Sequence, residues 1–107
     1  MNQGEYLLVL TTLPADHDAE ALAMALVSER LAACVSVLGD MQSTYWWEGR
    51  VERSPERQVL IKTTAARWPQ LVERIGRLHP YGVPEIIAVP IHAGLPAYLR
   101  WVSEVTI

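Results

Sequence analysis

The residues best suited to chemistry are few and lie far apart in the chain. There is one cysteine, Cys34, and there are three isolated histidines, His17, His79 and His92. Copper and zinc sites need thiolate, imidazole and carboxylate groups at spacings that converge, yet no Cys-x-x-Cys or His-x-x-x-His pattern is present. A glycine-rich phosphate loop, an HExxH helix and a serine-hydrolase signature are also missing. The sequence therefore predicts no catalytic residue and no required cofactor.

Cys34 and Lys62 each allow a functional and a structural interpretation. Cys34 would act as a nucleophile only in an electropositive setting, and its apolar neighbours favour a small buried side chain instead; they are Ala32, Ala33, Val35 and Val37. It could also line a cleft between subunits. Lys62 ends an apolar stretch, where it could hold an anion or pair with Glu48 or Glu85, or simply be solvated.

Tyr45, Trp46 and Trp47 are three aromatic residues directly before a Glu-Gly turn. Adjacent strand residues point to opposite faces, so Trp46 and Trp47 cannot share one core. We therefore expect at least one of the three to contact a neighbouring subunit. A strip for stacking nucleic-acid bases is disfavoured, because the net charge is −3 and no basic patch is present.

Hydrophobic periodicity predicts the elements that position these residues. Apolar stripes at helical spacing predict helices over 19–27, 68–78 and 96–102, and strand-like runs fall at 6–12, 34–47, 50–63 and 85–89. Gly39 and Asp40 suggest a bulge. The segment 54–56 contains Pro55 and should interrupt the return strand. Thr63 or Thr64 is expected to cap the second long helix.

This order predicts an α+β, ferredoxin-like fold (β-α-β-β-α-β plus a C-terminal helix) with an antiparallel sheet. All of residues 1–107 should form a single domain. Both long helices should lie on one face of the sheet, which leaves the other face uncovered. Half of the residues are hydrophobic and the mean hydropathy is +0.12, a high value for so small a chain. We therefore expect another copy of the chain to cover the open face.

Cysteine usage and hydropathy predict a cytoplasmic protein without nucleic-acid or membrane partners. The single cysteine cannot form an internal disulfide, which fits a reducing compartment. The longest apolar run is far below the roughly 18 residues that a membrane span needs. The first five residues lack the basic region of a signal peptide.

Four sequence blocks together resemble the CutA family, the divalent-cation tolerance proteins. They are LAACV at 31–35, YWWEG at 45–49, IKTT at 61–64 and HPYGVPEII at 79–87. The resemblance runs from about residue 6 to residue 102. It implies a ferredoxin-like subunit in a tight homotrimer, similar to PII signalling proteins, and a non-enzymatic role in tolerance or response to divalent metal ions.

The resemblance also bears on copper. Copper-binding relatives carry a cysteine where this chain has Thr11 and an additional histidine where it has Leu78, whereas Glu85 is retained. Only weak binding of Cu(II) or another divalent cation is therefore expected, with His79 and Glu85 as candidate ligands. The alternative for His79 is a helix C-terminal residue favoured by the helix dipole.

Two alternatives stay open. One is a PII-like sensor that binds a small anionic ligand between subunits, and the other is an uncharacterised enzyme that uses Cys34 or Glu85. The residues expected near the inter-subunit pocket are Cys34, Trp47, Lys62, Tyr81 and Glu85.

Overall fold

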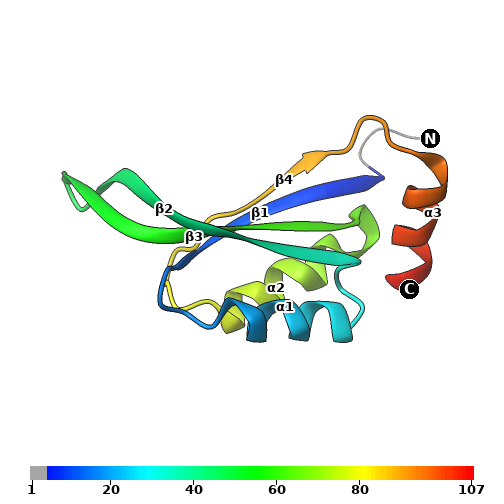
Figure 1. Ribbon diagram of the computed structural model, residues 1–107, viewed down its shortest axis with the longest axis horizontal. Helices are drawn as coiled ribbons and strands as arrows, with labels where there is room; N and C mark the ends of the chain where they lie inside the picture. The colour runs from blue at the N-terminus through cyan, green and yellow to red at the C-terminus, as the bar shows by residue number, and fades with distance from the viewer. Residues whose placement is uncertain (1–4) are drawn as a thin grey trace.

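A four-stranded antiparallel sheet with helices on one face organises the chain (Figure 1). The structure is a computed structural model and describes residues 5–107. The strands are β1 (Tyr6–Pro14), β2 (Cys34–Trp47), β3 (Arg50–Thr64) and β4 (Ile86–Pro90); the helices are α1 (Ala19–Ser28), the short 3-10 helix η1 (Ala65–Arg67), α2 (Trp68–Leu78) and α3 (Pro96–Val105).

The strand order β2-β3-β1-β4 is that of a ferredoxin-like sheet and confirms the predicted fold class. β1 lies between β3 and β4 and pairs antiparallel with both. β2 and β3 form a hairpin that extends well past the end of β1, so the molecule is elongated, with principal extents of 44 × 25 × 24 Å (Figure 1).

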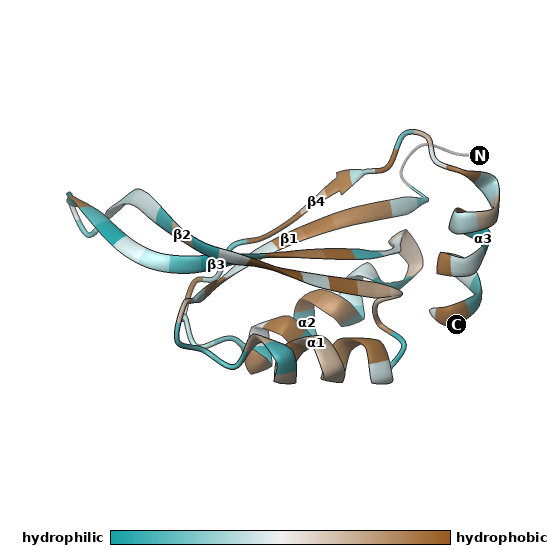
Figure 2. Ribbon diagram, viewed as in Figure 1, coloured by the Kyte–Doolittle hydropathy of each residue, from teal (hydrophilic) through white to brown (hydrophobic). Residues whose placement is uncertain are grey.

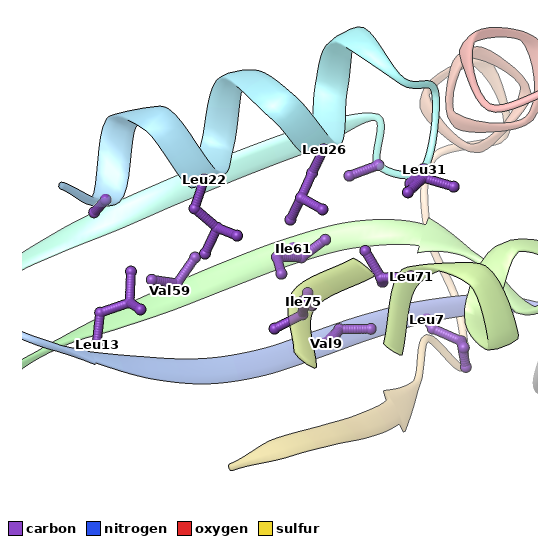
Figure 3. Packing of buried hydrophobic residues seen from close by; sticks show 12 residues of the cluster. Leu7, Val9, Leu13, Leu22, Leu26, Leu31, Val59, Ile61, Leu71 and Ile75 are labelled. Atoms are coloured by element: carbon purple, nitrogen blue, oxygen red, sulfur yellow. The ribbon is translucent and has the colours of Figure 1, made fainter. Parts of the chain in front are cut away.

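The core fills the space between α1, α2 and one face of the sheet (Figure 3). Side chains from both helices meet alternate residues of β1 and β3, because only every second strand residue faces the helices. Asp18 caps α1 by accepting a hydrogen bond from the backbone N–H of Ala21 at 3.1 Å. The fully buried residues include Val9, Leu13, Leu26, Val59, Ile61, Leu71 and Ile75.

The predicted threonine cap of the second long helix is wrong. Thr63 points into the core and donates its hydroxyl hydrogen bond to the backbone oxygen of Leu31 at 2.7 Å. Thr64 precedes η1 and makes no side-chain cap. α2 begins only at Trp68, with Pro69 in its first turn, where the missing N–H of proline costs nothing.

The predicted interruption of β3 at residues 54–56 is also wrong. β3 continues through Pro55, which pairs with Gln42 of β2. The carbonyl of Pro55 accepts from Ala15 just beyond the end of β1, so the missing N–H of Pro55 also faces the side where β1 has ended. The β2 bulge is confirmed, because the register shifts between Val37 and Asp40.

The second face of the sheet, here called the open face, carries apolar residues that α1 and α2 do not cover. Cross-strand partners lie on the same face, so two rows run across all four strands. One row is Cys34, Lys62, Leu8 and Val89, and the other is Ser36, Leu60, Leu10 and Ile87. Strands β1 and β4 are hydrophobic along most of their length (Figure 2).

Helix α3 packs at one end of the sheet rather than over the open face (Figure 1). Leu99 and Val102 bury against Tyr6 and Ala33, and the Tyr6 hydroxyl hydrogen-bonds the Ser103 hydroxyl at 2.7 Å. None of the helices within residues 5–107 has both the length and the apolar character needed to cross a membrane.

Candidate functional site

A cleft of about 730 Å³ opens where the β2–β3 hairpin leaves the sheet. The segment between α2 and β4, yellow in Figure 1, passes the base of the hairpin and forms the opposite wall. We call this space the hairpin cleft. Its lining residues are Thr12, Ser43, Thr44, Tyr45, Trp47, Glu56, Pro80, Tyr81, Gly82, Val83 and Glu85.

The strand register explains why the hairpin side of the cleft is both aromatic and acidic. Met41 pairs with Glu56, so Tyr45 and Trp47 lie on the same side of the hairpin as Glu56. Trp46 points to the opposite side and is 74% exposed. The Tyr45 hydroxyl is fixed by a 2.7 Å hydrogen bond to the Ser54 hydroxyl.

Glu56 and Tyr81 join the two walls of the cleft. Glu56 is only 5% exposed, and its Oε2 accepts a 2.7 Å hydrogen bond from the Tyr81 hydroxyl. Burial and this carboxylate together raise the pKa of the Tyr81 phenol well above its ordinary value of 10.0. The phenol therefore stays protonated at neutral pH and serves as a hydrogen-bond donor, which suits binding rather than base catalysis.

His79 holds the second wall in place. Its ring Nδ1 accepts from the backbone N–H of Tyr81 at 3.1 Å, so the ring proton must sit on Nε2, which donates to the backbone oxygen of Thr12 at 2.6 Å. Its ring also lies against that of Tyr81, with centroids 4.9 Å apart. Burial lowers the pKa of His79 below 6.5, although the bond to Thr12 opposes this shift.

The hydrogen bonds of His79 bear directly on its candidacy as a metal ligand. A neutral histidine binds a metal through a ring nitrogen lone pair, and the Nδ1 lone pair is already used by Tyr81 while Nε2 carries the proton. Glu85 lines the cleft and is exposed. Among residues 5–107, no cluster of three or more His, Cys, Asp or Glu side chains is arranged to hold a metal ion.

Three of the five residues expected near an inter-subunit pocket lie together within one chain. Trp47, Tyr81 and Glu85 line the hairpin cleft. Cys34 and Lys62 do not line it; they are cross-strand partners on the open face.

Cys34 is half-buried, and the described part of the chain gives its thiol one hydrogen-bonding contact, to the Ser36 hydroxyl at 3.8 Å. A hydroxyl cannot act as the base that activates a nucleophilic cysteine.

Sequence reasoning did not single out Thr12, Ser43, Thr44 or Glu56 as site residues. Glu56 was missed because the preceding residue, Pro55, suggested a break in the strand. Had β3 been taken as continuous, Glu56 would have fallen at the same alternating positions as Leu60 and Lys62, on the open face.

The fold and the cleft define a small ferredoxin-like α+β protein with an acidic cleft that has aromatic walls. The sequence profile of the family described as "CutA1 divalent ion tolerance protein" matches residues 7–105. The chain belongs to this family, as its sequence blocks indicated.

Relatives match over almost the whole chain. The divalent-cation tolerance protein CutA of Thermus thermophilus is 48% identical, over 92% of this chain and 96% of that protein. A solved structure of the divalent cation tolerance protein (Cut A1) from Thermus thermophilus superimposes with a TM-score of 0.92 at 46% identity, covering 95% of this chain and 99% of that one. CutA from Xylella fastidiosa has a TM-score of 0.92 at 43% identity, covering 96% of this chain and 99% of that one.

Proposed function

We propose that this chain is a non-enzymatic CutA-type protein that acts as a homotrimer in the response to divalent metal ions. The observation that carries the proposal is the match to the tolerance-protein family across residues 7–105. The protonated phenol of Tyr81 and the unactivated thiol of Cys34 support a binding role over catalysis. A cytoplasmic location and the lack of nucleic-acid and membrane partners stay predictions.

The open face supports the trimer. Ile87 and Val89 are 51% and 49% exposed on its edge strand, and Leu8, Leu10 and Leu60 lie beside them. Burying such apolar area stabilises an assembly by roughly 25 cal/mol per Å² removed from water. Tyr45, Trp46 and Trp47 are also exposed on the projecting hairpin, where a neighbouring copy would contact them.

The acidic character of the hairpin cleft supports weak divalent-cation binding. Glu85 supplies an exposed carboxylate, and Glu56 a second one deeper in the same cleft. Tight binding of copper would require a thiolate ligand or an imidazole with a free ring nitrogen. His79, the other candidate ligand, is committed to its hydrogen bonds, so Glu85 is the better candidate for Cu(II) or another divalent cation.

Calorimetric titration of the purified protein with Cu(II) and Zn(II) tests this proposal. Weak binding is expected for the wild type, with about tenfold loss in Glu85→Gln because one charged ligand is removed. Glu104→Gln, an exposed carboxylate on α3, is the matched control and should bind like the wild type. If Glu85→Gln bound Cu(II) and Zn(II) as tightly as the wild type, the proposal that the hairpin cleft binds the metal ion would be contradicted.

A PII-like sensor with its pocket between subunits is the second candidate. One observation favours it: Cys34 and Lys62 face each other on the open face, so a copy covering that face would place the only lysine of the chain at a subunit boundary. Lysine there could bind a small anion. A thermal-shift screen of nucleotides and small acids should raise the melting temperature, more in the wild type than in Lys62→Met; a flat screen would contradict this candidate.

A further inference from the structure

We propose that a groove between α1 and α3 binds a small organic acid, with the carboxylate held by Arg30 and the apolar body placed against Trp101. The groove has a volume of about 340 Å³, and we call it the α1–α3 groove. Its lining residues are Val27, Ser28, Arg30, Ala32, Ala33, Trp101 and Val105.

The α1–α3 groove lies away from the open face and from the hairpin. Val27 and Ser28 belong to the last turn of α1, which packs on the opposite face of the sheet. The last turn of α3 reaches this side, where the backbone oxygen of Val105 accepts a 3.2 Å hydrogen bond from Arg30 (Figure 1). None of the seven lining residues belongs to the two rows of the open face or to the hairpin aromatics. A homotrimer that buries the open faces therefore leaves this groove accessible.

Arg30 gives the groove a positive charge that no acidic side chain neutralises. It is the one charged residue of the lining within the described chain. The adjacent carboxylate, Glu29, is bound instead by Arg74, with two contacts of 2.9 Å. Within residues 5–107 the Arg30 side chain makes one hydrogen bond, from Nη1 to Val105, so Nε and Nη2 stay free. These two donors on one edge of a guanidinium can hold a carboxylate through parallel hydrogen bonds.

The ends of the two helices do not cancel this charge, although the C-terminus of a helix is electrically negative. At the end of α1, the Val27 carbonyl accepts from the backbone N–H of Arg30 at 3.0 Å. At the end of α3, the carbonyls of Val105 and Thr106 accept from the guanidinium groups of Arg30 and Arg67. Because these carbonyls already hold donors, the groove keeps a net attraction for an anion.

The backbone at Arg30 supports a role for its side chain. Its φ is +61°, in the left-handed region that favours glycine. The N–H groups of Arg30 and Leu31 bond the carbonyls of Val27 and Leu26, a helix ending at which glycine is the usual residue. Strained residues of this kind cluster at binding sites. The bond to Val105 is exposed, and water would serve that carbonyl as well, so a bound anion better explains the guanidinium.

The walls of the groove suit an apolar body attached to the carboxylate. Trp101 and Val27 are 40% and 41% exposed, so both have surface left to bury. The Trp101 ring rests against that of Tyr98, with centroids 5.5 Å apart, which supports it from one side. Aromatic and alkyl groups gain free energy by leaving water against such a surface. The volume falls in the range of small-molecule sites.

NMR titration of the 15N-labelled assembled protein in EDTA tests the proposal. The probe is sodium 3-phenylpropionate, and 3-phenylpropanamide is its neutral isostere. We expect shifts of the Trp101 indole N–H and of the Ala33 backbone N–H, and binding of the acid about tenfold tighter than that of the amide. Trp101→Leu, followed at Ala33, should weaken binding of the acid several-fold.

Arg30→Gly is the decisive variant, because glycine suits the left-handed backbone and should preserve the fold. It should abolish the preference for the acid, whereas Arg30→Lys, which keeps the charge but lacks the planar fork, should retain part of it. Arg100→Gln, an exposed arginine of α3 outside the groove, is the matched control and should bind like the wild type.

Three results would overturn the proposal: equal binding of the acid and the amide, an unchanged preference in Arg30→Gly, or no shift at Trp101 and Ala33 at concentrations on the order of 100 mM. The groove is built within one chain and the titration excludes metal. The outcome is therefore independent of the Cu(II) and Zn(II) titration and of the number of subunits.

Discussion

The imidazole of His79 shows how one buried side chain can organise a site without taking part in its chemistry. Its two nitrogens bond Tyr81 and Thr12, which belong to the two sides of the cleft, and its ring supports that of Tyr81. Protonation would turn Nδ1 from an acceptor into a donor and break the bond from the Tyr81 N–H. The neutral form of His79 is therefore the form that the fold requires.

This requirement makes stability depend on pH. The pKa of His79 is lowered in the folded protein, so the unfolded chain binds a proton more readily around its ordinary value of 6.5. The stabilisation is complete above that value and is lost as pH falls below it. Urea unfolding at about pH 7.5 and about pH 5.5 should show a larger loss in the wild type than in His79→Gln. His92→Gln, at an exposed position, should behave like the wild type; if His79→Gln kept the full pH dependence, the assignment would be wrong.

The bond between Tyr81 and Glu56 gives a second prediction at this scale. Tyr81→Phe leaves a buried carboxylate oxygen without its donor, which should lower the free energy of unfolding by about 1–3 kcal/mol. Tyr98→Phe is the matched control, because its ring packs on Trp101 at the surface of α3. Denaturant titration at one protein concentration measures both. A change no larger for Tyr81→Phe than for Tyr98→Phe would contradict the importance of this bond.

At the scale of elements, periodicity predicted the order of strands and helices, because each element buries one face with a regular spacing. It could not predict how β3 passes Pro55, since that depends on where β1 ends beside it. The predicted helix cap at Thr63 was wrong for a related reason. The Thr63 hydroxyl bonds the backbone oxygen of Leu31, a contact that depends on the tertiary fold and that local sequence does not show.

The site was only partly predictable. Trp47, Tyr81 and Glu85 stood out by type and by family resemblance, and they share the cleft. Glu56 needed the three-dimensional pairing of β2 with β3 to be found.

Two glycines in different elements should respond oppositely to alanine. Gly49 turns the hairpin with φ of +81°, a conformation that strains any residue with a Cβ, so Gly49→Ala should destabilise by about 1 kcal/mol. Gly76 lies in α2, and a Cβ added there would enter open space, so Gly76→Ala should stabilise by up to about 1 kcal/mol. Urea midpoints compare the two variants at one protein concentration. Shifts of the same sign in both variants would contradict this account of the turn.

At the scale of the whole molecule, the sheet separates two environments. One face is filled by α1 and α2 (Figure 3), whereas the open face carries mostly apolar residues on β1 and β4. Placing a charge on the open face should therefore weaken assembly far more than the same change on a helix. We expect Ile87→Asp to shift the protein toward monomers, and Met24→Asp, at an exposed position of α1, to leave the assembly unchanged. Sedimentation velocity distinguishes these outcomes, and equal assembly of both variants would count against the open face as the interface.

The solution mass of the unmodified protein tests the central claim most directly. Multi-angle light scattering at micromolar concentration should give three times the 12.0 kDa mass of one chain, because three copies bury the open faces that one copy exposes. A folded species of 12.0 kDa under the same conditions would contradict the account.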